Sequence, residues 1–173
     1  MTYLQLILLV VIRMSDRKPQ VSQYGSVDPA PPSQTGNIEM WKHSLVDDNT
    51  PMFQRMRNLF SLRNDGTDES CLALCFGFKS SSALLRHELA YVLGQMQNPI
   101  ALPHLVERLS DSDEHVMVRH EAAEAMGAIG DLSVRSVLEE FCNDENPEVS
   151  ESCEVALDLL AWCNSEEWDK VKW

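Results

Sequence analysis

Apolar residues recur at spacings of three and four along most of this 173-residue chain, and no stretch shows sustained alternation of apolar and polar residues. The first spacing follows one face of an α-helix, whereas alternation would indicate a half-buried strand. The periodic pattern extends over residues 36–162. We therefore predict an all-α domain in this region.

The two ends of the chain have a different pattern. Residues 1–35 combine an apolar run at 3–12 with a polar, proline-rich stretch, which predicts a disordered or extended segment and linker. The run is too short to cross a bilayer and has no basic flank before it, so we predict a short free helix and no membrane partner. Residues 163–173 are predicted to form a carboxyl-terminal tail.

An internal repeat organises the helical region. The sequence LRHELAYVLG at 85–94 aligns with VRHEAAEAMG at 118–127, and the match continues to Asp111 and Asp144. Each repeat has the length of two helices separated by a turn, which is typical of HEAT-like repeats. The predicted architecture is therefore a HEAT-like α-solenoid, in which successive repeats stack side by side.

Turn residues predict where these helices begin and end. A helix over 82–93 should be followed by Asn98 as an N-cap and Pro99 as the first residue of a second helix. The next repeat should have helices over 115–129 and 133–142, with a turn at Gly130.

Flanking repeats keep the apolar pattern but differ at two positions. A further helix begins near Asn146, and residues 51–62 form a similar segment upstream. Where the central repeats have His followed by Glu, the flanking segments have Arg55 and Met56 before them and Glu151 and Ser152 after them. The His-Glu pair is thus confined to the two central repeats.

His87 with Glu88, and His120 with Glu121, are the candidate functional residues. Equivalent positions on successive repeats share one surface, with helix axes about 8–10 Å apart. We therefore expect both imidazoles to reach one ion. Two histidines and one carboxylate, with open positions, are the ligands of reactive non-haem Fe(II) centres.

The direction of the glutamates bears on that hypothesis. Neighbouring helical residues diverge by about 100°, so each glutamate is expected to point away from the histidine before it. Glu88 would then face a second metal or an opposing surface, and this chain would lack a carboxylate for its own iron. The alternative is a polar ladder of these residues on the concave face of a scaffold that binds no metal.

Charge and cysteine content limit the class of partner. Acidic residues number 27 against 14 basic residues, which gives a net charge of −13. Such a surface repels phosphates, so we predict no nucleic-acid partner and favour a cationic one, although acidity also simply favours solubility. The five cysteines form no CxxC pair, which indicates neither a disulfide framework nor a zinc site and agrees with a cytoplasmic location.

Several segments together resemble the deoxyhypusine hydroxylases over about residues 24–160. They are YGSVDPAPP at 24–32, FSLRN at 60–64, ALLRHE at 83–88, YVLGQ at 91–95, VRHE at 118–121 and ESCEVALD at 151–158. The resemblance implies two HEAT-repeat halves joined by a linker and facing each other across a di-iron centre. The linker-like segment lies near the start of this chain, so the resemblance is to the carboxyl-terminal half.

The same resemblance implies roles for the candidate residues. His87 and His120 would be Fe(II) ligands, and Glu88 would reach the iron held mainly by the other half. Glu121 would belong to the metal site and would bind the cationic substrate. This chain would thus supply half of the di-iron ligands.

The implied reaction is the oxygen-dependent hydroxylation of deoxyhypusine to hypusine on a translation initiation factor. Its partners would be molecular oxygen and the deoxyhypusine form of that factor. The alternative is a non-catalytic HEAT-repeat protein that binds a partner or competes for the enzyme's substrate.

Overall fold

The computed structural model describes residues 19–170, so the short helix predicted at 3–12 lies outside the described residues. The chain divides into two compact units, Met1–Pro31 and Pro32–Trp173. In the first unit, residues 19–31 form a tight loop. The Ser22 amide donates to the Ser26 carbonyl at 2.7 Å, and Val21 forms an isolated β-bridge with Val27.

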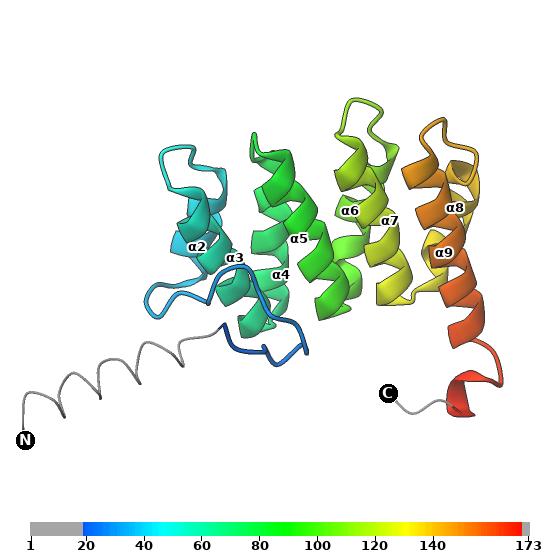
Figure 1. The fold of residues 1–173 in the computed structure, drawn as a ribbon, viewed down its shortest axis with the longest axis horizontal. Helices are drawn as coiled ribbons and strands as arrows, with labels where there is room; N and C mark the ends of the chain where they lie inside the picture. Colours follow the sequence, from blue (N-terminus) through cyan, green and yellow to red (C-terminus); the bar gives the residue numbers. More distant parts are fainter. Residues whose placement is uncertain (1–18, 171–173) are drawn as a thin grey trace, which may run out of the picture. The chain divides into compact units, whose positions relative to one another are not determined.

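The second unit consists of helices and short turns in its described part, which confirms the predicted all-α class. Its longer helices are α2 (Ile38–Val46), α3 (Met52–Asp65), α4 (Asp68–Phe76), α5 (Ala83–Met96), α6 (Leu102–Ser110), α7 (Val116–Ile129), α8 (Arg135–Phe141) and α9 (Pro147–Cys163). Figure 1 shows these helices side by side in chain order. The described helices include none that is long and apolar enough to span a membrane.

Local capping residues account for most helix ends. Ser82 accepts a hydrogen bond from the Leu85 amide at 3.3 Å and begins α5, while Gly130 ends α7 with a φ of 79°. Asn98 is also a cap, as predicted, but the helix after it does not start at Pro99. A 3-10 turn η2 (Pro99–Ala101) comes first, and the same occurs at η3 (Leu132–Val134) before α8.

Two glycines allow the helices α5, α7 and α9 to approach one another closely. A Cβ atom added to Gly94 would lie 3.0 Å from Ala125 Cα, and one added to Gly127 would lie 2.9 Å from Ala156 Cα. The repeated glycine therefore has a packing role, because any larger residue would push the next helix away. This contact holds α7 against α5 and α9 against α7.

An arginine recurs as the fourth residue of α3, α5 and α7. Each one donates to a backbone carbonyl that precedes its own helix, in the loop for α3 and α5 and in the last turn of α6 for α7, and each is at least half buried. The pairs are Arg55 Nε to Thr50 O at 2.9 Å, Arg86 Nη1 to Ser80 O at 2.7 Å, and Arg119 Nε to Leu109 O at 2.9 Å.

This recurrence corrects the predicted alignment of α3. Arg55 corresponds to Arg86, and not to His87, because both guanidiniums have the same role at the same helical position. Met56 and Arg57 therefore occupy the positions of the His-Glu pair. The conclusion that the pair is absent from this repeat is unchanged.

Ion pairs also join successive repeats. Arg86 donates to both carboxylate oxygens of Glu114, at 2.8 and 2.6 Å, and Arg119 donates to both oxygens of Asp144. The side chains of Glu114 and Asp144 are only 2% and 9% exposed. Arg86 and Arg119 thus each connect the backbone that precedes their own helix with the loop that begins the next repeat.

Candidate metal-binding site

His87 on α5 and His120 on α7 lie next to each other, as their repeat position predicted. Their ring centroids are 5.7 Å apart, and the ring planes are inclined by 40°. The close packing at Gly94 brings these two helices together. Both imidazoles remain accessible, with side-chain exposures of 24% and 26%.

Glu121 points toward the same space as the two histidines. Its Oε2 lies 3.1 Å from His87 Nε2 and 4.0 Å from His120 Nε2. Donor atoms of the three residues all lie within 4.8 Å of one another. The prediction that Glu121 would turn away from His120 is therefore wrong for this structure.

The reason lies in the length of the glutamate side chain. The divergence of about 100° between neighbours applies to their Cα–Cβ bonds, and two further torsions let the carboxylate bend back. Glu121 is buried between α7 and α5, where the His87 imidazole is its hydrogen-bonding partner. The chain thus does have a carboxylate beside its own pair of imidazoles.

Glu88 is the fourth predicted residue, and it does not join the other three. It lies half-buried on α5, outside the cluster formed by His87, His120 and Glu121. Its negative charge still acts on His87 at longer range.

The electrostatic environment favours positive charge at this position. The pKa of His87 is raised, mainly by its hydrogen bond to Glu121, with burial opposing the shift and the charges of Glu121, Glu88 and Glu124 adding to it. A cation at Nε2 is therefore stabilised, whether it is a proton or a metal ion. Two imidazoles and one carboxylate fit the donor set of Fe(II).

Two residues that the sequence did not predict lie on the outer side of His120, one in contact with its imidazole and the other in contact with the first. Glu124, one turn further along α7, has its Oε1 3.5 Å from His120 Nδ1. Ser152 on α9 donates to the same Oε1 at 3.2 Å. The spacing of four between His120 and Glu124 could have revealed the first contact, whereas the second depends on the packing of α9.

A hollow of about 330 Å³ opens beside His120, between α7 and α9. Three of its six lining residues are glutamates. The lining residues are His120, Glu124, Glu148, Glu151, Ser152 and Val155. The surroundings are therefore suited to a positively charged group close to the imidazole.

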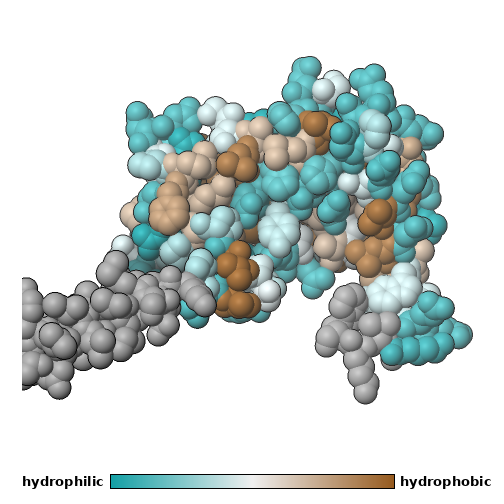
Figure 2. All heavy atoms as spheres, viewed as in Figure 1, coloured by the Kyte–Doolittle hydropathy of each residue, from teal (hydrophilic) through white to brown (hydrophobic). Residues whose placement is uncertain are grey.

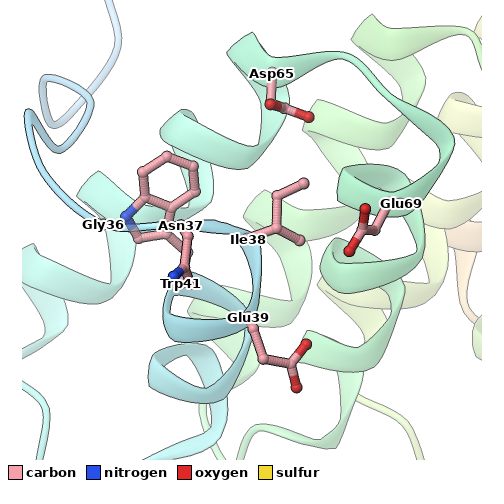
Figure 3. Close-up of a pocket in the computed structure, with 7 residues that line it drawn as sticks. All are labelled: Gly36, Asn37, Ile38, Glu39, Trp41, Asp65 and Glu69. Carbon is pink, nitrogen blue, oxygen red and sulfur yellow. The ribbon is translucent and has the colours of Figure 1, made fainter.

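A second hollow, of about 400 Å³, lies where α2 begins (Figure 3). It is lined by Gly36, Asn37, Ile38, Glu39, Trp41, Asp65 and Glu69. It contains no imidazole, and Glu39 is already paired with Lys42 and His43. Although this hollow is the larger of the two, no residue of the cluster lines it, whereas His120 lines the first.

No broad apolar surface covers the visible face of the second unit. Figure 2 shows mostly hydrophilic side chains there, with apolar residues in separate patches. Exposed apolar side chains include Phe53, Leu84 and Val155. Single exposed apolar residues of this kind are normal for protein surfaces.

Comparisons with known proteins agree with this architecture. A family model described as HEAT repeats matches residues 73–158. Deoxyhypusine hydroxylase of Candida albicans is 49% identical over 150 residues, which cover 84% of this chain and 47% of that protein. The human deoxyhypusine hydroxylase is 45% identical over 142 residues, covering 82% and 47%.

A solved structure gives the same result in three dimensions. Human deoxyhypusine hydroxylase in complex with glycerol matches with a TM-score of 0.81 and 42% identity, over 88% of this chain and 53% of that one. The chain thus spans about half the length of the relatives it matches. By sequence and by fold, it belongs to the deoxyhypusine hydroxylase family of HEAT-repeat proteins.

Proposed function

We propose that this chain supplies half of the ligands of a di-iron deoxyhypusine hydroxylase, with His87 and His120 binding iron through Nε2. The observation that supports this role is the convergence of both imidazoles and the Glu121 carboxylate within 4.8 Å. Chance placement of one His-Glu pair would not bring residues of two repeats together in this way.

Each of the four residues would have a distinct role. The two imidazoles would hold one iron, and the Glu121 carboxylate would balance its charge or accept a hydrogen bond from the substrate ammonium group. Glu88, which lies apart from the cluster, would reach an iron held mainly by the other half of the enzyme. The iron, when bound, would supply the activation of molecular oxygen that the hydroxylation of a C–H bond needs.

The proposed substrate is the deoxyhypusine side chain of a translation initiation factor. Its amines are cationic, and the glutamates around the hollow beside His120 would attract and orient them. The net charge of −13 would favour encounter with such a partner. We further propose a cytoplasmic location, which the five free thiols support.

Metal analysis of the purified chain tests this proposal. Under anaerobic conditions with excess Fe(II), we expect no more than one tightly bound iron per monomer, because one cluster of three donors lies in the described part of the chain. Substitutions His87→Ala and His120→Ala should each abolish tight binding. His104→Ala, which removes a histidine on α6 that is not part of the cluster, should not.

The outcomes separate the possible functions. Two tightly bound irons per monomer would refute the proposal that the chain supplies only half of the ligands. Equal iron binding by the three alanine variants would refute the assignment of His87 and His120 as ligands. The alternative of a non-catalytic scaffold is favoured by the His87–Glu121 pair, which satisfies both groups at 3.1 Å without a metal. A folded chain that binds no iron would support that alternative.

A further inference from the structure

The two histidines of the cluster differ in what their outer nitrogen atoms contact. His120 Nδ1 faces the Glu124 carboxylate at 3.5 Å. His87 Nδ1 is buried and has no hydrogen-bond partner among the described residues. Sequence explains the difference, because Tyr91 occupies in α5 the place that Glu124 has in α7.

Glu124 is itself held by the next repeat. Ser152 Oγ donates to Glu124 Oε1 at 3.2 Å, and Ser152 is buried with 7% exposure. Ser152 stands at the position where α7 has Glu121, which contacts the preceding helix in the same manner. The residue at this position therefore contacts the preceding long helix in both cases: Glu121 contacts His87 on α5, and Ser152 contacts Glu124 on α7.

The contact has a chemical consequence for the imidazole. A neutral histidine carries one proton, and a nearby carboxylate attracts it. Glu124 lies 3.5 Å from His120 Nδ1, nearer than Glu121 lies to Nε2 at 4.0 Å, so the tautomer with hydrogen on Nδ1 and a free lone pair on Nε2 is favoured. Histidines that bind metals usually donate their other N–H to such a carboxylate, which also orients the ring. A separation of 3.5 Å is long for this bond, and such contacts often tighten when a site is filled.

We infer that Glu124 is a positioning residue that keeps His120 Nε2 unprotonated and directed at the cluster, and that Ser152 orients Glu124. This role of Glu124 concerns the tautomer and orientation of His120 in the metal-free protein. Its effect on metal affinity rests on the proposed function. Two measurements therefore test the positioning role of Glu124 and the proposed metal function separately.

The first measurement needs no metal. Nitrogen-15 NMR of the metal-free chain, well above the ordinary histidine pKa of about 6.5, should show His120 with its proton on Nδ1. Glu124→Ala should shift the proton toward Nε2, and Glu124→Gln, which keeps an acceptor oxygen, should restore most of the original state. Glu148→Ala removes an equal charge from the same hollow and should leave the tautomer unchanged.

The second measurement is the affinity for Co(II), followed by its visible absorption. Glu124→Ala should weaken binding by about 10- to 100-fold, as is usual for loss of such a partner. Ser152→Ala should have a smaller effect of the same sign, and Glu148→Ala should have none. Glu124 is 49% exposed, so its removal should not affect folding, and circular dichroism would verify that.

The results are decisive in either direction. An unchanged His120 tautomer in Glu124→Ala, or equal effects of Glu124→Ala and Glu148→Ala, would overturn the positioning role. A wild-type chain that binds no Co(II) yet shows the expected change of tautomer would support the positioning role and contradict the proposed metal function.

Discussion

The α5–α6 and α7–α8 repeats have closely similar sequences but different surroundings. Both have Arg-His-Glu at the same helical positions, at 86–88 and at 119–121, and a glycine seven residues after the histidine. Yet one histidine has a carboxylate at its outer nitrogen, while the other has none among residues 19–170. A repeated motif thus determines where side chains stand, while the neighbouring repeat determines what they contact.

The arginines of the two repeats also differ in their surroundings. Glu114, the partner of Arg86, is contacted at 3.4 Å by Arg108 as well. For Asp144, the only cationic partner found in the described region is Arg119. Removing the guanidinium should therefore lower the free energy of unfolding by different amounts in the two repeats. These substitutions should have the largest effect on stability.

We expect Arg119→Met to destabilise the fold by about 3–5 kcal/mol, because it leaves the carboxylate of Asp144 with little solvent and no opposite charge. Arg86→Met should cost about 1–2 kcal/mol less, since Arg108 still partners Glu114. Urea unfolding, with unchanged m-values, measures both. Equal losses would show that Arg108 does not compensate, and the double variant Arg86→Met with Arg108→Met would then show no additional loss.

The two repeated glycines offer the next comparison. An alanine Cβ at Gly127 would lie 2.9 Å from backbone Cα of Ala156, so α9 would have to move. At Gly94 the corresponding distance is 3.0 Å, and the gain in helix propensity of about 1 kcal/mol offsets more of the strain. We expect Gly127→Ala to cost about 2–3 kcal/mol and Gly94→Ala about 1 kcal/mol or less.

Thermal unfolding of both glycine variants, together with Gly127→Val, checks this ranking. The valine variant should be the least stable of the three, because it adds two further methyl groups at the same contact. If the Gly127→Ala variant were more stable than the Gly94→Ala variant, α7 and α9 would separate easily.

Acid stability should differ between the repeats as well. The Arg119 hydrogen bond, against the opposing effect of burial, lowers the pKa of Asp144 to about 2 from its ordinary 3.8. Because the folded pKa is the lower one, the stabilisation is complete above about pH 4 and is lost as pH falls toward about 2. Its magnitude is about 2 kcal/mol.

Asp144→Asn should remove this part of the acid dependence. The variant should be less stable than the parent at neutral pH, and the difference should shrink through the same pH window in urea titrations. A difference that stays constant from neutral pH to about pH 2 would contradict the assigned pKa.

The smallest effect should come from making the two repeats alike. Tyr91→Glu places a carboxylate one turn after His87, as Glu124 stands after His120. We expect a gain of about 0.2–0.5 kcal/mol, typical of such helical pairs, and a His87 proton shifted toward Nδ1. Nitrogen-15 NMR would detect this shift, and Tyr91→Gln serves as the uncharged control.

Local signals in the sequence were sufficient for most of the fold. Ser82, Asn98, Gly130 and Asn146 marked helix boundaries because capping depends on a few adjacent residues. The starts of α6 and α8 were predicted too early, since a 3-10 turn after the cap has the same sequence signal as a helix. The register of α3 was wrong by one residue, because apolar spacing alone left it ambiguous.

The amino-acid sequence was sufficient to place His87 and His120 on one surface, because a repeat period of 33 residues returns each helix to the same orientation. It also determined the family. The packing of the helices was needed to show that Glu121 bends toward α5, that Glu88 lies outside the cluster, and that Ser152 donates to Glu124. Those outcomes depend on side-chain torsions chosen by contacts across neighbouring helices, and such contacts join residues about 30 positions apart.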